Sequence, residues 1–563
     1  MDLEALGAVE DHDADGADAD RLARLTRLVI ALGVALRLTR YALGHPLWGD
    51  EAFLATSLLD RDLAGLLRPL EYGQVCPVGF LATVWAIVRT LGFHEYALRL
   101  FPTMCSLASL FVFDGWMRGL LKPRARLFAT AIFAIAMFPI RHGGEVKPYA
   151  TDLLVATSLL AAASSFLTKP ERTRTIWILA AAALIAPAFS SPSMFVTAGL
   201  SLALAWRLRE RPSRRGWIAW GALNVSIAAS YALWFVALSN APEASVQEGL
   251  RKYWADGFPP LGRPVELTLW MLRTHTGHMV GYPVGGANGA SALTAIAIAA
   301  AVVWTARRGE VARLLLLLGP LGPAFAAAAL HMYPYGGSQR TMLYFAPAAC
   351  VLAGLGLDLG VGAIRDVERR RRLVVALTSA CVLGATTMLV FDVLMPYKCV
   401  YDERSREFAR WFWRTEADGA ELVCAKRDLG AVFEPRHWQL LRTALYQCNQ
   451  AIYAEGHGRS AAAGSSKEPS RTDRPLRIVL YNEWPVENPA FQAWIHDLET
   501  RYTLRDLRVY RVNRGVRSRD TSYEDVYRVL EFEPRDGAIA AQTPSGGRLG
   551  RGVDRSGSGR TQR

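Results

Sequence analysis

The stretch from Arg369 to Leu394 reads RRRRLVVALTSACVLGATTMLVFDVL: four arginines, then 22 residues of which only Asp392 is charged. A transmembrane helix needs about 20 mainly apolar residues. Short loops rich in Arg and Lys stay on the cytoplasmic side. The stretch therefore predicts a membrane-spanning helix that leaves the cytoplasm after Arg372.

Similar apolar runs recur through most of the chain, which has 563 residues, 51% of them hydrophobic and 20% charged. Their number predicts an all-α polytopic membrane protein with about eleven transmembrane helices plus juxtamembrane helices. The predicted spans are Leu25 to Leu43, Leu100 to Leu120, Leu127 to Ile140, Tyr149 to Leu167, Ile176 to Phe189, Met194 to Trp206, Trp217 to Leu238, Ala290 to Trp304, Leu314 to Leu330, Met342 to Leu359 and Leu373 to Leu394.

The formal charge of +13 comes from short groups of arginines beside these runs rather than from one continuous patch. This pattern favours membrane topology over nucleic-acid binding. It places the acidic tail 1–24 in the cytoplasm, ahead of an uncleaved first span. All the basic loops fall on the cytoplasmic side only if Pro77 to Gly92 does not cross the membrane and is a juxtamembrane or re-entrant helix. The alternative is that this segment is an ordinary transmembrane helix. The segments then facing outward are His45 to Leu98, Arg141 to Pro148, Ser239 to Gly289 and His331 to Thr341.

After the transmembrane domain 25–394 the hydropathy changes, and 395–513 is predicted to form a small extracytoplasmic α/β domain. The expected helices are Val400 to Glu416 and Pro489 to Tyr502, and the expected strands are Glu421 to Lys426, Arg477 to Tyr481 and Arg508 to Val512. The range 456–473 reads as a linker and 514–563 as a disordered basic tail. Cys399, Cys424 and Cys448 would permit one disulfide in an oxidising compartment, with the pairing open.

Two adjacent carboxylates follow the first span, in the motif Trp48-Gly49-Asp50-Glu51-Ala52. Sugar transfer to a hydroxyl needs a base that removes the acceptor proton, and a carboxylate at the membrane surface suits this role. The structural alternative is that the pair only marks the N-terminus of a helix.

The next outward segment, Arg141-His142-Gly143-Gly144-Glu145-Val146-Lys147-Pro148-Tyr149, crowds ionisable groups at one membrane boundary, and Asp152 follows inside the next apolar run. Such groups in or beside spans are functional candidates. Alternatively, Arg141 and Lys147 extend toward the headgroups and Glu145 pairs with one of them.

Arg99 and Arg340 each lie just before a span on the outward side, where positive charge is disfavoured. A guanidinium holds a phosphate with two hydrogen bonds, so both are candidate ligands of an anionic lipid carrier; binding of ordinary lipid headgroups is the alternative. His275 and His278 have helical spacing that would suit a metal site. The loop Tyr253 to Asp256 could cover an active site or contact an acceptor.

With these motifs in this order, the chain resembles the GT-C glycosyltransferases, in particular the group of protein mannosyltransferases, aminoarabinose transferases and their lipopolysaccharide-core relatives. The resemblance covers residues 25 to 360 and rests on Asp50-Glu51, Cys76-Pro77, Leu98-Arg99-Leu100 and Glu145-x-Lys147-x-Tyr149. It implies a bundle of spans around an outward-facing cavity.

The resemblance also implies roles for individual residues. Asp50 would be the base, Glu51 its support and Glu145 the second acidic residue. The groups that would bind the phosphate of the donor are Arg99, Lys147 and Arg340; His142, Tyr149 and Trp48 would make further contacts with the substrate. Some relatives place an acidic-basic pair where this chain has Gln74-Val75-Cys76-Pro77, so a metal ligand and a phosphate-binding lysine would both be missing here. The resemblance therefore assigns no certain cofactor, and a divalent metal stays the alternative.

The function implied is inverting transfer of a sugar, a hexose or pentose, from a polyprenyl-phosphate carrier to a lipid, glycan or protein acceptor outside the cytoplasm, in the inner or plasma membrane. Two rivals remain. A transporter or flippase would show internal repeats with interrupted spans, and none is clear in the sequence. A membrane-anchored receptor or assembly factor would leave Asp50, Glu51 and Glu145 without a role.

Overall fold

A computed structural model describes residues 12–242, 244–394, 400–415, 421–424, 437–453, 475–481, 489–512 and 525–535. The chain divides into two compact units. The first consists of Met1–Arg414, Leu440–Ala462 and Gly515–Arg519, and the second of Thr415–Gln439, Ala463–Arg514 and Asp520–Arg563. The first part of the acidic tail, up to residue 11, and the linker 456–473 lie outside the described residues.

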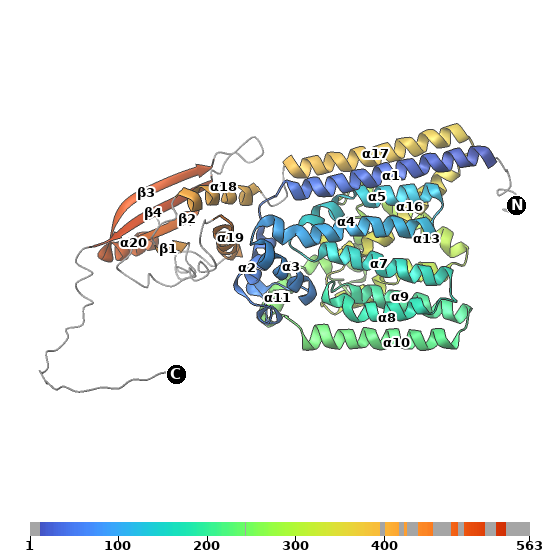
Figure 1. The fold of residues 1–563 in the computed structure, drawn as a ribbon, viewed down its shortest axis with the longest axis horizontal. Coiled ribbons are helices and arrows are strands. Elements are labelled where there is room, and N and C mark those ends of the chain that lie inside the picture. The colour runs from blue at the N-terminus through green and yellow to red at the C-terminus, as the bar shows by residue number, and fades with distance from the viewer. Residues whose placement is uncertain are drawn as a thin grey trace, which may run out of the picture. The chain divides into compact units, whose positions relative to one another are not determined.

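The first unit is a helical bundle with a helix at every predicted span (Figure 1). The helices are α1 (His12–Ala42), α4 (Glu95–Leu120), α5 (Pro123–Ile135) with α6 (Met137–Arg141), α7 (Tyr149–Thr168), α8 (Arg174–Ile185), α9 (Ser193–Glu210), α10 (Arg214–Tyr231), α13 (Gly289–Arg307), α14 (Val311–Leu318) with α15 (Leu321–Ala329), α16 (Ala346–Gly362) and α17 (Val367–Leu394).

Among the described residues, six helices are long and apolar enough to cross a membrane, and eight if each of two bent pairs is one span. The bent pairs are α5 with α6, at 45°, and α14 with α15, at 42°. The remaining predicted spans are helical but fall short by these criteria: α8 has 12 residues, α1 carries several arginines, and α9 carries two arginines and a glutamate. The polytopic helical fold is confirmed, with fewer qualifying spans than the eleven expected.

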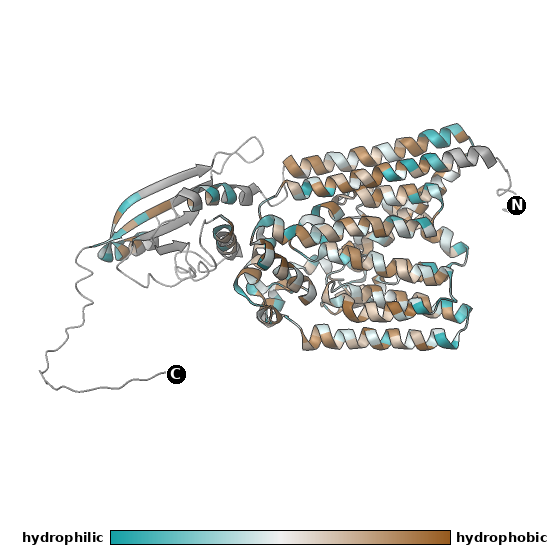
Figure 2. Ribbon diagram, viewed as in Figure 1, coloured by the Kyte–Doolittle hydropathy of each residue, from teal (hydrophilic) through white to brown (hydrophobic). Residues whose placement is uncertain are grey.

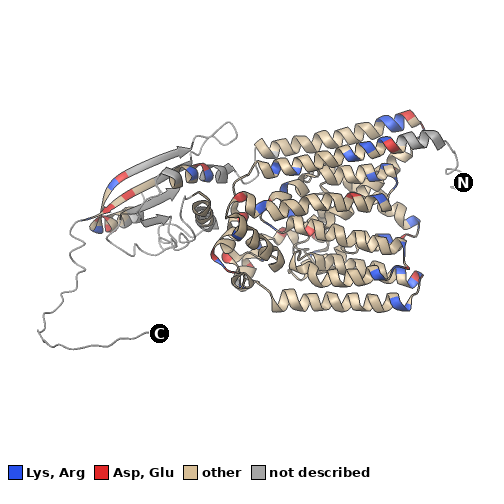
Figure 3. Ribbon diagram, in the orientation of Figure 1, with Lys and Arg blue, Asp and Glu red and all other residues tan. Residues whose placement is uncertain are grey.

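The surface of the bundle suits a membrane. Only 17% of the apolar stretch of α10 and 22% of that of α17 is buried within the protein, and hydrophobic residues run along both helices (Figure 2). Lys and Arg gather at the end of the bundle where α9 ends and α10 begins (Figure 3). This distribution agrees with a cytoplasmic position for that end.

Helix α16 forms the centre of the bundle, with 83% of its apolar stretch buried. It packs between α5 and α13, and two glycines allow the close approach. A Cβ on Gly354 would lie 2.5 Å from the backbone nitrogen of Ala129, and one on Gly356 would lie 1.9 Å from the carbonyl oxygen of Ala297. Any side chain at these positions would force the helices apart.

A buried arginine stabilises the bend between α5 and α6. Arg37 of α1 donates from Nη1 to the carbonyl of Ala134 at 2.7 Å and from Nε to Ser106 Oγ at 3.0 Å, and Ser106 Oγ in turn donates to the carbonyl of Pro139 at 3.2 Å. A helix break exposes carbonyls that must find donors inside a membrane protein. The bend they stabilise turns the chain toward the segment 141–148.

Short elements occupy the segments predicted to face outward. They are α2 (Gly49–Asp60), η2 (Gly65–Leu67), η3 (Glu71–Gly73), α3 (Val78–Leu91), η4 (His142–Gly144), α11 (Ala244–Tyr253), η7 (Ala255–Gly257), α12 (Pro264–Thr276), η8 (His278–Val280) and η9 (Gln339–Phe345). Helix α3 has 14 residues, shorter than a typical span, which fits the juxtamembrane helix predicted there.

Two helices beyond the last span belong to the first unit. They are α18 (Val400–Thr415) and most of α19 (His437–Tyr453), which the sequence had placed in the C-terminal domain. Buried Ala444, Leu445 and Cys448 of α19 share one apolar cluster with Leu54 and Leu58 of α2. Helix α19 was not predicted, and it contributes directly to the packing of α2.

The second unit contains a four-stranded sheet with the order β1-β2-β4-β3. Its elements are β1 (Glu421–Cys424), β2 (Leu476–Tyr481), α20 (Pro489–Arg501), β3 (Tyr502–Val512) and β4 (Asp525–Pro534). Strand β1 runs parallel to β2, while β4 runs antiparallel to both β2 and β3. A small α/β domain is confirmed, but β4 lies inside the range predicted to be a disordered tail. Its position between two strands satisfies its backbone on both sides, a tertiary effect that composition does not reveal.

Of the three cysteines considered for the predicted disulfide, the structure describes the side chain of Cys448 only. Cys448 is buried with a free thiol. Cys399 and the side chain of Cys424 lie outside the described residues, so a disulfide between these two stays a prediction.

Candidate active site

Helix α2 begins at the motif that carries the two adjacent carboxylates. Trp48 is its N-cap residue, and Asp50 and Glu51 lie in the first turn, where a negative charge favours the helix dipole. Consecutive helical residues point about 100° apart. As a result, the side chain of Glu51 is 1% exposed, while that of Asp50 is 28% exposed.

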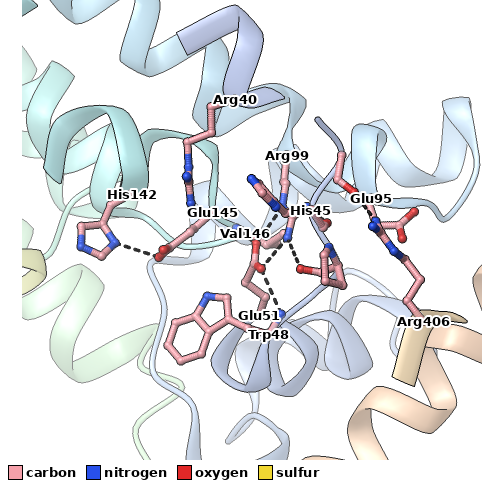
Figure 4. A network of polar contacts seen from close by, with 12 residues as sticks. Arg40, His45, Trp48, Glu51, Glu95, Arg99, His142, Glu145, Val146 and Arg406 are labelled. Atoms are coloured by element: carbon pink, nitrogen blue, oxygen red, sulfur yellow. Dashed lines mark hydrogen bonds and ion pairs between the residues drawn. The ribbon is translucent and has the colours of Figure 1, made fainter. Parts of the chain in front are cut away.

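Glu51 forms a buried ion pair with Arg99 of α4 (Figure 4). Arg99 Nε donates to Glu51 Oε1 at 2.9 Å and Nη2 to Oε2 at 2.5 Å. Glu51 also accepts hydrogen bonds from the backbone nitrogens of Val146, at 2.8 Å, and Trp48, at 3.2 Å. Arg99 also donates from Nη1 to the carbonyl of His45 and from Nη2 to the carbonyl of Pro46. The predicted phosphate ligand Arg99 is thus joined to Glu51 and to the loop before α2.

Asp50 pairs with Arg340, which comes from η9, 290 residues further along the chain. Arg340 Nη1 donates to Asp50 Oδ2 at 2.7 Å, and Nη2 donates to the hydroxyl of Tyr253 at 3.2 Å. Its guanidinium carbon lies 5.0 Å from the ring centroid of Trp254 and 5.7 Å from that of Trp48. Cation–π contacts of this kind hold a guanidinium in place while leaving some of its N–H groups for other partners.

Lys147 lies buried in the same region. Its ammonium donates to the side-chain oxygen of Gln74, two residues before Cys76-Pro77. Burial lowers the pKa of Lys147, an effect that the nearby carboxylate of Asp50 opposes. Lys147 thus lies close enough to Asp50 and Arg340 for their charges to affect its own.

Glu145 is the third acidic residue of the site, and its charge is matched by basic groups. His142 Nδ1 lies 3.0 Å from Glu145 Oε2 (Figure 4). Burial alone would raise the pKa of Glu145, but His142, together with Arg40 and Arg141, lowers the pKa to about 2. Arg40 also donates to the carbonyl of Arg141 at 3.2 Å. Glu145 is therefore ionised at neutral pH and helps to fix the segment 141–148.

The aromatic candidates line the same segment. The ring of His142 stacks on Phe138, with centroids 6.0 Å apart, and meets the edge of Tyr149 at 5.5 Å. Asp152 lies in the first turn of α7, and its sequence pattern predicts no specific role. Its carboxylate is 4% exposed, and Oδ1 has no hydrogen-bond partner in the part of the chain that the structure describes.

The histidine pair does not assemble a metal site. His275 Nε2 lies 3.0 Å from the hydroxyl of Tyr335, and His278 contacts Gln339. Within the described ranges, no group of three or more His, Cys, Asp or Glu side chains is arranged to hold a metal ion.

The arrangement leaves one carboxylate partly accessible. Glu51 and Glu145 are buried and matched by Arg99 and His142, whereas Asp50 is partly exposed beside Arg340. A partly exposed carboxylate beside a guanidinium and an ammonium can exchange a proton with one bound group while the cations hold an anion.

Comparison with solved structures gives the fold a known counterpart. ArnT from Cupriavidus metallidurans bound to undecaprenyl phosphate superposes with a TM-score of 0.51 at 12% identity, covering 89% of this chain and 97% of that chain. Its apo state gives a TM-score of 0.50 at 13% identity, with the same coverage. The Archaeoglobus fulgidus oligosaccharyltransferase, in complex with Zn and sulfate, matches with a TM-score of 0.41 at 10% identity, covering 75% of this chain and 61% of that chain.

No family model and no curated protein matches the chain by sequence. The fold likeness extends over most of both chains in the comparison with ArnT. The chain therefore has the GT-C fold that its motifs predicted.

Proposed function

We propose that the protein is an integral membrane glycosyltransferase that moves a sugar from a polyprenyl-phosphate carrier to an acceptor on the extracytoplasmic side. The fold supports this proposal because it is shared with a structure that binds undecaprenyl phosphate. The observation that carries it is the pairing of partly exposed Asp50 with Arg340 at 2.7 Å, beside buried Lys147.

In the proposed reaction, the donor phosphate replaces Asp50 as the partner of Arg340. When the phosphate of the carrier arrives, Arg340 and Lys147 bind its oxygens, and Asp50 loses its arginine partner. Asp50 then accepts a hydrogen bond from the acceptor hydroxyl. Binding of the donor thus prepares the base.

In the transfer step, the acceptor oxygen forms a bond to the anomeric carbon from the face opposite the phosphate. The bond between that carbon and the phosphate oxygen breaks, and its electron pair leaves with the phosphate. The acceptor proton passes to Asp50. The cationic groups stabilise the departing anion, which is where charge develops, and the configuration at the carbon inverts.

The other predicted site residues act through these groups. The Glu51–Arg99 pair positions the start of α2 and ties it to the segment 141–148 through the nitrogen of Val146. Arg99 is accordingly assigned a positioning role rather than contact with phosphate. Glu145 with His142 holds the same segment, while Trp48 and Tyr149 are proposed to contact the substrate.

The test is turnover of a radiolabelled polyprenyl-phosphate sugar in membranes that contain matched amounts of wild type, Asp50→Asn or Arg340→Gln. Loss of a general base lowers the rate by about 100-fold or more, so Asp50→Asn should lower product formation by at least that factor. Donor binding should be retained or become tighter, because Arg340 no longer has to exchange a carboxylate for the phosphate. Arg340→Gln should weaken donor binding as well.

The control is Asp358→Asn. Asp358 also pairs with an arginine, Arg124, through Oδ1 at 2.5 Å, but it lies in α16 away from the proposed site. Turnover should persist in this variant. Full turnover in Asp50→Asn would rule out Asp50 as the base. Movement of the carrier across the membrane without release of the sugar would favour a flippase.

A further inference from the structure

A left-handed turn in η3 lies directly before Gln74, the residue whose side-chain oxygen accepts a hydrogen bond from Lys147. Tyr72 has a φ of 55° and Gly73 a φ of 65°. A positive φ is sterically unfavourable for a bulky residue, and such conformations persist only where the surroundings enforce them. The contacts around this turn should therefore show what it positions.

Helix α2 holds the turn from one side. The ring of Tyr72 stacks on that of Phe53, with centroids 4.8 Å apart and planes inclined by 24°. The backbone nitrogen of Glu71 donates to Ser57 Oγ at 3.1 Å. Phe53 and Ser57 belong to the helix that carries Asp50, so the turn and the proposed base are fixed to the same element.

The outward segment 239–289 holds the turn from another side. Asn240, which is 4% exposed, donates from Nδ2 to the carbonyl of Cys76 at 2.8 Å. A Cβ on Gly73 would lie 2.4 Å from Cγ1 of Val246 in α11, so glycine allows this close approach. Gln74 thus lies between backbone positions that are fixed on both sides.

The two contacts of the Gln74 amide agree with one orientation of its side chain. Oε1 accepts from the ammonium of Lys147, and Nε2 lies 3.5 Å from the carbonyl oxygen of Tyr72. An amide oxygen accepts a hydrogen bond without carrying a charge, and an ammonium has three donors. Gln74 therefore orients Lys147 and leaves its charge and its other donors for an anion.

The ionisable groups that affect Lys147 come from several elements. They are Asp50 of α2, Cys76 before α3, Arg340 of η9 and Glu145 of its own segment. Lys147 is 6% exposed, and no carboxylate of the described residues forms an ion pair with its ammonium. The hydrogen bond from Lys147 thus goes to a neutral group, although Asp50 and Glu145 lie near enough to affect its charge.

We propose that Gln74 is a positioning residue: the turn at Tyr72-Gly73 directs its neutral oxygen at Lys147 and so holds the ammonium in the site without cancelling its charge. This inference rests on the proposed function, in which Lys147 and Arg340 bind the donor phosphate. A carboxylate in place of the amide would compete with that phosphate for Lys147, because opposite charges attract strongly at short range in a buried site.

The first test is the titration of Lys147 in the full-length protein in neutral detergent. Trace acetylation across a pH series, read by mass spectrometry, gives the pH at which this ammonium loses its proton, with exposed Lys169 as internal reference. In Gln74→Glu the midpoint should rise by about 1 pH unit or more, because a neighbouring negative charge favours the ammonium. In Gln74→Met it should fall, because the charged form loses an acceptor. A residue that only supports the fold would shift neither midpoint.

The second test is the donor KM for the radiolabelled polyprenyl-phosphate sugar. Gln74→Glu should raise it about tenfold, because the new carboxylate takes one cation away from the phosphate. The matched control is Gln247→Glu, which makes the same change on an exposed side chain of α11. It should alter neither the midpoint of Lys147 nor the donor KM.

An unchanged midpoint in Gln74→Glu, or an equal rise in Gln247→Glu, would overturn the positioning role. So would a raised midpoint with an unchanged donor KM in an active protein, because Lys147 would then take no part in donor binding. The titration needs no turnover. Shifted midpoints in a protein whose wild type transfers no sugar would refute the transferase and keep the contact between Gln74 and Lys147, whereas an active wild type with unshifted midpoints would do the opposite.

Discussion

At the scale of single residues, the site depends on how two adjacent carboxylates are separated. Asp50 and Glu51 are neighbours in the sequence, but one is partly exposed at the surface of the site and the other accepts four hydrogen bonds in its interior. A buried ion pair leaves a costly unpaired charge when one partner is removed. The two positions should therefore respond to substitution in different ways.

We expect Glu51→Gln to reduce the free energy of unfolding by about 3–5 kcal/mol, because it leaves Arg99 buried without a countercharge. Asp50→Asn should cost less than this, because the Asp50 side chain is 28% exposed and Arg340 keeps its contacts with Tyr253, Trp48 and Trp254. Thermal unfolding in detergent measures both. Equal midpoints for the two variants would contradict the structural role of Glu51, and restored stability in Glu51→Gln/Arg99→Gln would support it.

The pKa of Glu145 makes a second prediction at this scale. Its pKa is about 2 in the folded protein and 4.5 ordinarily, so its ionised form contributes stability above about pH 4.5 that is lost as the pH falls toward 2. The unfolding midpoint of wild type should drop more steeply across this window than that of Glu145→Gln. In His142→Gln the pKa of Glu145 rises toward its ordinary value, so the loss should be smaller and should be complete at a higher pH.

At the scale of secondary-structure elements, the position of α2 depends on a helix from beyond the last span. Cys448 of α19 lies 3.6 Å, sulfur to oxygen, from the carbonyl of Ala52, and the hydroxyl of Tyr453 donates to Glu95 at the start of α4. Helix α19 thus contacts both helices that supply the Glu51–Arg99 pair.

Leu445→Ala tests this contact, because Leu445 is 2% exposed in the cluster shared with α2. Removing a buried leucine side chain costs about 2–5 kcal/mol. Both the unfolding midpoint and turnover should fall, since α2 carries Asp50. Leu383→Ala makes the same change at a position that is 70% exposed and should leave both nearly unchanged. Unaltered turnover in a destabilised Leu445→Ala would show that α19 supports the fold without positioning α2.

At the scale of the whole molecule, charge sets the orientation in the membrane. We expect the basic loops, such as the one between α9 and α10, to lie on the cytoplasmic side and the site elements α2, η4 and η9 to lie on the other. The inner or plasma membrane with an outward-facing site is our proposal for the location.

Reporter fusions measure this orientation. Green fluorescent protein fused after Ser213, in the loop between α9 and α10, should fluoresce, because it folds in the cytoplasm. Alkaline phosphatase fused after Gly262, between η7 and α12, should be active, because it folds outside. The opposite pattern at both sites would invert the topology, and activity of both reporters at one site would indicate mixed insertion.

The sequence determined the features that follow from local composition. Apolar runs of about 20 residues can satisfy their backbone in lipid only as helices, so every predicted span is helical, and the order of Asp50-Glu51, Arg99 and Glu145 predicted the GT-C fold. Most strands of the C-terminal sheet were also predicted, because their alternation is local.

Only the tertiary structure decided which charges meet. The pairs Asp50–Arg340 and Glu51–Arg99 join residues 290 and 48 positions apart, and no local pattern shows that Arg99 pairs with the buried Glu51 while Arg340 pairs with the partly exposed Asp50. The same holds for β4 and α19, whose stability comes from neighbours distant in sequence. Packing rather than composition assigned the partners, because burial and pairing depend on which segments fold together.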